Sequence, residues 1–348
     1  MNKLTSEQLL EKVSSMKLFC LDNSFEIAFE KQFIVPYAGI DIVADMYPEY
    51  SGCAVYMVLQ ADKIIITDID LNNDPPIIKY RNCATNEKHQ IDNLWFFPFP
   101  IPKNALHMEI ISDNFIEVDI KEEWRLRKPQ WQEFGPMKLS IYDLIIQSRR
   151  QEKTISEYDL LYIGSSKDVY RRLLNHETIP KIHRYMASFR TNKELFIWIL
   201  KPKSYFYKQS RSEFAAITLS SSVRSKDKDF GIDIENEHLL AISEAMLIHY
   251  FKPEYNKLYK NNKPNYSHVV YAKLYDAGVK HLQVHLNLFM QKDKELLSVK
   301  TENENTRKEM HISLHGALEN LLKEPEDSII SVEVLPEELY SLFIGDYL

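Results

Sequence analysis

The sequence predicts an α+β fold in three parts, and two changes of pattern lead to this division. Residues 1–19 suit an amphipathic helix, and the rest of 1–130 consists mostly of short β-branched and aromatic runs. From about Met137 strand-like runs alternate with helices, and a second change follows residues 261–264. We therefore expect a β-rich N-terminal domain over 1–130, a central domain over 137–260 and a small α+β C-terminal domain over 265–348.

The predicted elements follow from hydrophobic periodicity and from turn residues. In the N-terminal part, residues 53–58, 63–71 and 106–120 are strand candidates. In the central part we expect strands at 141–147, 159–165 and 195–200, and helices at 168–176, 181–190 and 235–251, the last stopped by Pro253. In the C-terminal part we expect strands at 268–275, 281–288 and 329–335 and a helix at 310–323.

The charge of the chain is unevenly distributed. The 348 residues carry a net charge of -7, which by itself does not suggest a nucleic-acid partner. Between Arg149 and Lys228, however, 17 lysines and arginines face 8 acidic residues, a local balance of about +9. A basic block inside an acidic chain predicts contact with a polyanion, and the alternative is an ordinary solvated, lysine-rich surface.

The lack of a long apolar segment and the cysteine pattern both bear on the cellular location of the protein. No window approaches eighteen uninterrupted apolar residues, so we expect no membrane span. The three cysteines, Cys20, Cys53 and Cys83, are widely spaced and odd in number. This pattern predicts neither a disulfide framework nor a zinc knuckle, and it favours a reducing, cytoplasmic location.

The chemistry is concentrated in residues 160–176, LLYIGSSKDVYRRLLNH, and in a second segment around Glu244. Arg172 and His176 are four apart on a predicted helix and share one face. Ser165 or Ser166 can cap that helix, and Asp168 suits its first turn, so its N-terminus could hold a phosphate.

Glu244 has a different setting. It lies in an apolar helix, where a carboxylate needs a partner because an unpaired buried charge is costly. A divalent metal ion is one such partner.

These residues resemble the GIY-YIG nuclease family over about 138–260. Tyr162-Ile163-Gly164 matches the YIG motif, Arg172 and His176 follow ten and fourteen residues after Tyr162, and Glu244 matches the metal-binding glutamate. Residues 252–256, Lys-Pro-Glu-Tyr-Asn, look like the family's terminal proline-to-asparagine turn. The resemblance implies a central domain with a small antiparallel sheet flanked by helices.

The first motif of the family departs from its usual form. No Gly-Ile-Tyr is present, and the nearest candidate is Ser140-Ile141-Tyr142. Alternatively, residues 137–149 form a helix capped by Ser140. Tyr158 is then the other candidate, because two-residue periodicity places it on the same strand face as Tyr162.

The resemblance implies a metal-dependent DNA endonuclease that uses Mg²⁺ or Mn²⁺ on Glu244. Tyr142 or Tyr162, with His176, would orient or deprotonate the attacking water, and Arg172 would stabilise charge on the phosphate. The residues expected to bind nucleic acid are Ser165, Ser166, Lys167, Arg171, Lys201, Lys203, Lys208 and Arg211.

Family analogy favours a role in restriction or phage defence. A double-strand cut with one site per domain would require a homo-oligomer or two successive nicks. The alternatives are an RNA-cleaving nuclease and a scaffold or nucleic-acid-binding module that keeps the fold without turnover.

Overall fold

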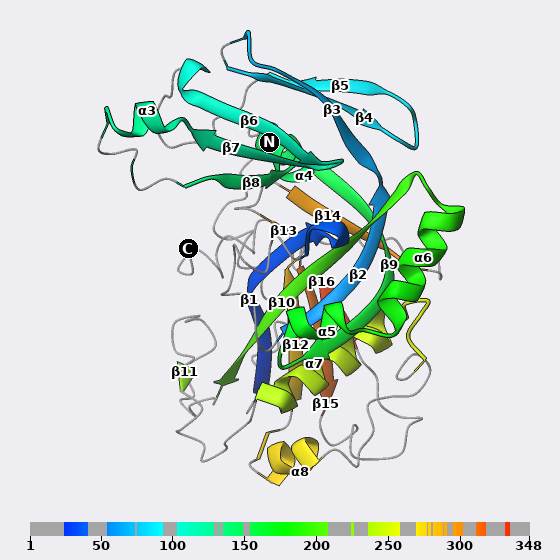
Figure 1. Ribbon diagram of the computed structural model, residues 1–348. Helices are drawn as coiled ribbons and strands as arrows, with labels where there is room; N and C mark the ends of the chain where they lie inside the picture. The colour runs from blue at the N-terminus through cyan, green and yellow to red at the C-terminus, as the bar shows by residue number, and fades with distance from the viewer. Residues whose placement is uncertain are drawn as a thin grey trace, which may run out of the picture.

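The computed structural model shows an α+β fold with a curled, many-stranded sheet and few helices (Figure 1). It describes residues 24–40, 54–73, 75–92, 103–128, 132, 135–148, 154–207, 224–225, 236–257, 269–276, 278–279, 281–287, 289–290, 295–301, 311–317 and 331–334. Within them, no helix is both long and apolar enough to cross a membrane. The first predicted helix, in residues 1–19, lies outside these ranges.

The main sheet has ten strands, nine of them in the order β13-β14-β9-β2-β10-β1-β12-β15-β16, with β11 paired to β10. The strands are β1 (Ser24–Pro36), β2 (Ala54–Asp62), β9 (Thr154–Ser166), β10 (Lys193–Tyr207), β11 (Arg224–Ser225), β12 (His281–Asn287), β13 (Phe289–Met290), β14 (Glu295–Lys300), β15 (His311–Ala317) and β16 (Ser331–Val334). The β1–β12 and β14–β9 pairs are parallel and the others antiparallel.

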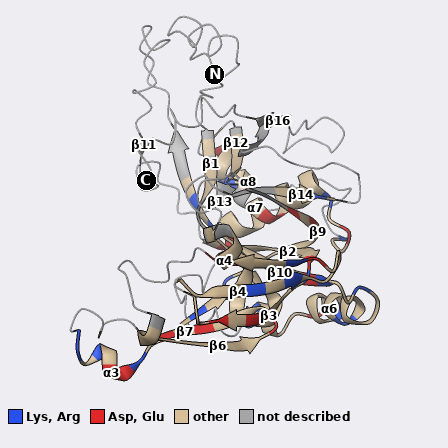
Figure 2. Cartoon of the chain, turned by 90° about the horizontal axis from the view of Figure 1, so that it is seen from above, with Lys and Arg blue, Asp and Glu red and all other residues tan. Residues whose placement is uncertain are grey.

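Helices cover both faces of the central strands, which explains why β2 and β10 are continuous apolar runs. On one face, α7 (Asn236–Phe251) and α8 (Val269–Asp276) pack into a core that contains Val55, Met57 and Trp198. On the other face, α5 (Val169–Leu174) and α6 (Thr178–Phe189) pack over Tyr56 and Val58. The short 3₁₀ helix η1 (Tyr37–Gly39) follows β1. Figure 2 shows α6 and α7 on opposite sides of β2 and β10.

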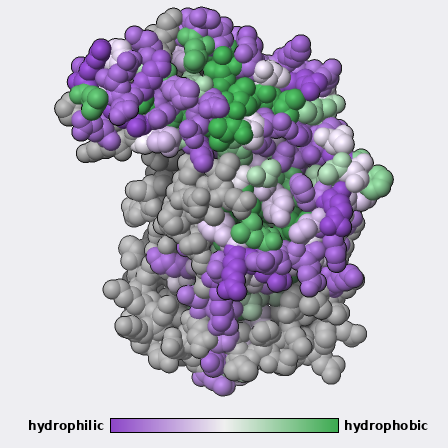
Figure 3. Space-filling view, in the orientation of Figure 1, coloured by the Kyte–Doolittle hydropathy of each residue, from purple (hydrophilic) through white to green (hydrophobic). Residues whose placement is uncertain are grey.

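A separate module is inserted between β2 and β9. It contains one sheet of β3 (Ile64–Asp70), β4 (Ile77–Asn82) and β5 (Lys88–Ile91), and a second of β6 (Leu106–Ser112), β7 (Phe115–Ile120) and β8 (Met137–Ser140). The module also holds η3 (Lys103–Ala105), α3 (Glu122–Arg125) and α4 (Ile141–Ser148). Residues of both sheets and α4 share one core, and hydrophobic side chains also reach its surface (Figure 3).

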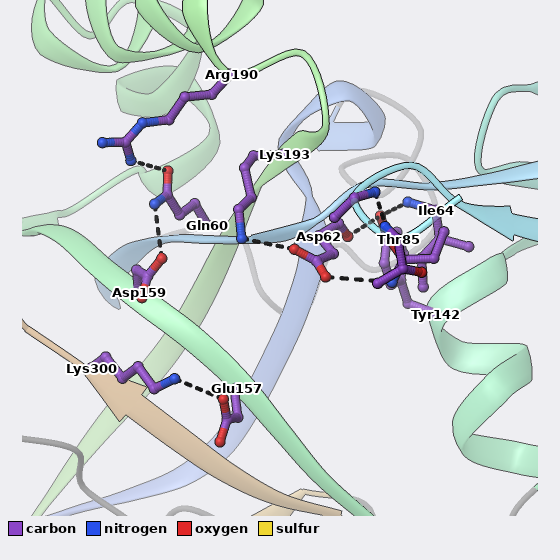
Figure 4. Close-up of polar contacts among 12 residues, drawn as sticks. Gln60, Asp62, Ile64, Thr85, Tyr142, Glu157, Asp159, Arg190, Lys193 and Lys300 are labelled. Carbon is purple, nitrogen blue, oxygen red and sulfur yellow. Dashed lines mark hydrogen bonds and ion pairs between the residues drawn. The ribbon is translucent and has the colours of Figure 1, made fainter. Parts of the chain in front are cut away.

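A polar network surrounds the end of β2, where the module begins, and Asn82 of β4 joins it by donating to Asp62 at 3.4 Å (Figure 4). Lys193 on β10 donates to Asp62 at the end of β2, at 2.7 Å. Gln60 donates to Asp159 at 2.8 Å and accepts from Arg190 at 3.1 Å, so it links β2, β9 and the end of α6. These contacts fix the base of the insert beside the central strands.

The sheet does not follow the three predicted parts. Its strands come from the N-terminal, central and C-terminal segments alike, so the boundaries at 130–137 and 260–265 do not divide it. The central strand β10 pairs with β1 and β2, both of which belong to the predicted N-terminal domain. Non-local pairing of this kind leaves no local mark in the sequence.

Three predicted elements are wrong in type. Residues 141–147 were expected as a strand but form α4, because the Ser140 hydroxyl accepts the Tyr142 N–H at 3.1 Å and caps a helix. The alternative prediction, a helix capped by Ser140, is confirmed over Ile141–Ser148. Residues 268–275 contain α8 instead of a strand, since Tyr271 and Leu274 reach the core at helical spacing. Residues 311–317, expected as a helix, form β15 because they pair along their whole length with β12.

Candidate active site

Two neighbouring strands at the centre of the sheet carry the tyrosines of the site. Strands β2 and β9 run antiparallel, with Tyr56 opposite Gly164 and Val58 opposite Tyr162. Tyr56 and Tyr162 both lie on the α5–α6 face, and their ring centroids are 6.2 Å apart. Tyr56 is only 1 % exposed, whereas Tyr162 is partly buried. Tyr56 therefore lies in the core, and Tyr162 lies on the side of the pair that faces solvent.

A β-bulge sets the direction of Tyr162. The register shifts between Val58 and Leu59, which pair with Tyr162 and Leu160 and leave Leu161 as the extra residue. Leu161 and Tyr162 consequently share the α5–α6 face, and Tyr158 turns to the α7 face, where its ring packs against Phe196 at 5.3 Å. The expectation that Tyr158 and Tyr162 share a face is wrong, because the bulge breaks the two-residue alternation.

The segment after α7 holds the bulged strand in place. α7 ends at Phe251, and Lys252 adopts a left-handed conformation with φ 50° before Pro253. Asn256 then accepts the Ile163 N–H and donates to the Ile163 carbonyl, both at 2.8 Å, while the Tyr255 N–H donates to the Leu161 carbonyl at 2.9 Å. This turn pairs with β9 on either side of Tyr162 and so positions that tyrosine.

Helix α5 brings Arg172 to the tyrosines. Asp168 caps the helix by accepting the Arg171 N–H at 3.1 Å, so the cap is Asp168 and neither serine. The Arg172 guanidinium donates to the Tyr56 hydroxyl, which in turn hydrogen-bonds Tyr162. Burial raises the pKa of both phenols above their usual value, and Glu244 adds to the rise. Both tyrosines are therefore protonated at neutral pH.

His176 is held in one tautomer. Its Nδ1 accepts the N–H groups of Thr178 and Ile179 at 2.9 and 3.2 Å, which caps the start of α6. The neutral ring must therefore carry its proton on Nε2, which is buried and has no hydrogen-bond partner in the described part of the chain. Burial first, and then Arg172, lower the pKa of His176 to about 4. The ring stacks edge-on against Tyr162 and Tyr56, so Nε2–H is a donor within the site.

Glu244 reaches the same place from the opposite helix. It lies on α7, and the Ser165 hydroxyl, near the end of β9, donates to its carboxylate at 2.5 Å. Burial raises the pKa of Glu244, while Ser165 and Arg172 oppose the rise. Its charge also acts on Tyr56 and Tyr162. Glu244 is therefore a partly buried carboxylate that Ser165 ties to the end of β9, within electrostatic reach of the two phenols.

The donor set around Glu244 suits a hard divalent cation. It consists of one carboxylate and nearby hydroxyl oxygens, which match the oxygen preference of Mg²⁺ and Mn²⁺. Mg²⁺ is typically bound by one or two carboxylates, with water and phosphate completing the shell. The described residues hold no group of three or more His, Cys, Asp or Glu side chains arranged for a metal.

Tyr142 does not join this cluster. It lies on α4, where the Ile64 N–H donates to its hydroxyl at 3.0 Å and its ring packs on Phe196 at 4.7 Å. Burial raises its pKa, with Glu194 adding to the rise. Tyr142 thus connects the inserted module to β10, and the tyrosine that faces Tyr162 is Tyr56.

The other predicted nucleic-acid contacts are scattered. Ser166 donates to the Asp168 carbonyl at 2.9 Å, Lys167 forms an ion pair with Glu237 of α7, and Arg171 is exposed on α5. Lys201 and Lys203 lie on β10 beyond the part paired with β2. Lys208 and Arg211 fall outside the described residues.

Tyr56 is the residue that sequence reasoning missed. The strand at 53–58 was expected, and it contains Tyr56, but this tyrosine was not among the candidate site residues. The inserted module separates this tyrosine from Tyr162 by more than a hundred residues, so nothing local links them. The signal that could have found it is a tyrosine within an apolar strand upstream of the insert.

Comparison with known proteins finds no relative: no family model, no curated protein and no solved structure matches this chain.

Proposed function

We propose that this chain is a metal-dependent nuclease that hydrolyses phosphodiester bonds, preferentially in DNA, through a GIY-YIG-like site. One observation carries the proposal. Tyr56, Tyr162, Arg172, His176 and Glu244 come from different elements and converge at one end of the β2–β9 pair. In this proposal Ala54-Val55-Tyr56 takes the place of the first motif, with alanine for the family's glycine, on the strand antiparallel to Tyr162-Ile163-Gly164.

The proposed roles follow from the donors and acceptors of the site. The Arg172 guanidinium binds the phosphate and stabilises the charge that develops on it. The Nε2–H of His176 donates to a phosphate oxygen, because its other ring nitrogen is occupied by the start of α6. The protonated hydroxyls of Tyr56 and Tyr162 orient the attacking water by hydrogen bonds, since their raised pKa values keep them neutral.

Glu244 is the proposed ligand of Mg²⁺ or Mn²⁺. When bound, the ion would supply positive charge to neutralise the scissile phosphate and to favour deprotonation of water. Ser165 holds the carboxylate in its rotamer through the 2.5 Å hydrogen bond. Cation binding would also relieve the cost of burying the Glu244 charge, which raises its pKa in the protein alone.

Plasmid and end-labelled oligonucleotide substrates test the proposal. In Mg²⁺, Glu244→Gln keeps the shape of the side chain but removes its charge, and Arg172→Ala removes the phosphate donor. We expect each to reduce the cleavage rate at least about a hundredfold. Tyr56→Phe is compared with Tyr142→Phe. A loss of cleavage in Tyr142→Phe but not in Tyr56→Phe would overturn the assignment of Tyr56, and cleavage that survives Glu244→Gln would overturn the metal site.

A nucleic-acid-binding module without turnover is the second candidate. It is favoured by the raised pKa values of Tyr56 and Tyr162 and by the occupied Nδ1 of His176, which leave no ready proton acceptor among these residues at neutral pH. Binding of DNA or RNA with no cleavage of either, in Mg²⁺ and in Mn²⁺, would establish this candidate. Cleavage of RNA alone would assign the site to RNA.

The biological role that we propose is restriction or phage defence, and it rests on family analogy alone. A single site of this kind cuts one strand at a time. A double-strand cut would then need a homo-oligomer or two successive nicks, which the order of nicked and linear plasmid products distinguishes.

A further inference from the structure

Helix α6 has one buried face and one aromatic, exposed face. Ile179, Ile182 and Met186 recur at helical spacing and are buried in the core beneath the helix. On the other side, Tyr185 is 45 % exposed and Phe189 is 75 % exposed. Ile179, Ile182 and Met186 already anchor α6 to the core, and the two exposed rings do not contribute to that buried face. Packing therefore does not explain why these two positions are aromatic.

The two rings form one platform. They are four residues apart on the helix, their centroids are 5.2 Å apart and their planes are inclined by 39°. The Arg190 guanidinium lies 5.9 Å from the centre of the Tyr185 ring, and its position is fixed by the hydrogen bond to Gln60 (Figure 4). Tyr255 lies close enough for Tyr185 and Arg190 to influence its pKa. One edge of the platform is thus anchored to the central strands.

The surroundings of the platform are basic. Residues 178–193 contain Lys181, Arg184, Arg190 and Lys193 and no acidic residue, in a chain whose net charge is -7. In Figure 2, α6 carries blue segments and no red ones at the edge of the molecule. Glu177 and Glu194 lie at the two ends of this stretch, Lys193 donates to Asp62 at 2.7 Å, and Glu254 hydrogen-bonds Tyr255, whereas Lys181 and Arg184 are exposed on the helix itself. The helix therefore offers flat apolar rings inside a positive field.

This combination fits unpaired bases joined by phosphates. Lysine and arginine attract the backbone, and exposed rings stack on the faces of bases. A duplex hides its base faces, so it would use the charges but not the rings. Two rings surrounded by cations are also too small an apolar area for an ordinary protein interface.

We propose that Tyr185 and Phe189 form a stacking platform for unpaired bases of the nucleic acid whose phosphate enters the candidate active site. This inference rests on the proposed function for its connection to cleavage. Helix α6 begins two residues after His176, and a rise of about 1.5 Å per residue places the platform roughly 11–17 Å along the helix. At about 3.4 Å per stacked nucleotide, the bases lie roughly three to five nucleotides from the scissile phosphate.

Binding without metal tests the platform separately from cleavage. Fluorescence anisotropy in EDTA would compare a labelled single strand of about twelve nucleotides, in DNA and RNA forms, with the matching duplex. We expect Tyr185→Ala and Phe189→Ala each to weaken single-strand binding about tenfold and duplex binding less than about twofold. Phe189→Tyr keeps an aromatic face and should bind like the wild type.

Arg184→Ala is the matched control on the same helix. It removes a charge and no ring, so it should weaken single-strand and duplex binding equally. The slope of log binding constant against log salt concentration should fall by the amount expected for the loss of about one phosphate contact. Unchanged single-strand binding by folded Tyr185→Ala and Phe189→Ala proteins would overturn the platform. Equal losses on duplex and single strand would also overturn it.

The cleavage assay keeps this inference apart from the proposed function. Ring-dependent binding by a wild type that cleaves nothing supports the platform and contradicts the nuclease. Cleavage that depends on Glu244, together with ring-independent binding, supports the nuclease and contradicts the platform.

Discussion

The ring of Tyr56 occupies the space that a side chain on Gly164 would need. The two residues are paired across β2 and β9, and a Cβ added at Gly164 would lie 2.5 Å from the Tyr56 hydroxyl oxygen and 2.6 Å from its Cζ. The glycine of the Tyr-Ile-Gly segment is thus explained by a close approach of side chain to backbone. Its φ is not in the left-handed region, so conformational freedom plays no part.

We predict that Gly164→Ala destabilises the protein by about 1–3 kcal/mol, because Tyr56 must move away from Arg172. Under the proposed function, the same displacement should also abolish cleavage. Urea unfolding measures the first effect and the oligonucleotide assay the second. Gly135→Ala is the control, since an added Cβ there meets nothing within 4 Å, and we expect a change within about 0.5 kcal/mol. A Gly164→Ala penalty that does not shrink in a Tyr56→Val background would contradict the clash.

Asn256 gives a second prediction, because it satisfies both backbone groups of buried Ile163. Asn256→Ala leaves an N–H and a carbonyl without these partners and should lower the free energy of unfolding by about 2–4 kcal/mol. Asn256→Asp keeps the acceptor but sets a carboxylate against the Ile163 carbonyl, so it should be destabilising at neutral pH and less so in acid. Denaturant unfolding at two pH values measures both. Equal stability of Asn256→Asp and wild type at neutral pH would contradict the pairing.

For His176 we predict a neutral Nε2–H tautomer from pH 8 down to about pH 5, since the pKa in the folded state is about 4. The folded state binds fewer protons than the unfolded state between about pH 4 and 6.5, so this contribution to stability is lost as the pH falls through that window. Long-range ¹H–¹⁵N spectra of the imidazole identify the tautomer.

The cap made by His176 has its own test. His176→Ala should lower the free energy of unfolding by about 1 kcal/mol through loss of the α6 cap. His107→Ala, at an exposed position on β6, should leave the free energy of unfolding almost unchanged. A protonated Nδ1 at neutral pH would rule out the capping role.

For Glu194 we predict a pH dependence of stability opposite in sign to that of His176. It lies on β10 beside the Lys63–Asp113 ion pair, and burial raises its pKa from 4.5 to about 7. The folded state therefore holds this proton more tightly, and stability is lost as the pH rises from about 4.5 through 7. Glu194→Gln should be more stable than wild type at pH 8, by at most about 3 kcal/mol, and equal to it near pH 4.

The control for this prediction is Glu109→Gln, which removes a charge from an exposed position on β6. It should leave the pH profile of the melting temperature unchanged. If the melting temperatures of Glu194→Gln and the wild type change in parallel from pH 4 to 8, burial of this carboxyl does not destabilise the folded protein, and the prediction is contradicted.

Local patterns in the sequence determined the helices around the site. The predicted helices at 168–176, 181–190 and 235–251 correspond to α5, α6 and α7, because helical spacing, apolar runs and stop signals such as Pro253 are local properties. The family resemblance, and not this spacing alone, singled out Arg172, His176 and Glu244. The expectation that Arg172 and His176 share one helix face is wrong, because α5 ends at Leu174 and His176 lies in the connection to α6. The charge imbalance was also readable directly, since it needs no structure.

Tertiary structure alone decided how these parts meet. The pairing of Tyr56 with the Tyr162 strand spans the inserted module, and the bulge at Leu161 reverses the alternation that would have selected Tyr158. Residues 311–317 became a strand because β12 was available to pair with them. Strand partners, register and bulges depend on contacts between distant residues, whose free energy no local segment records.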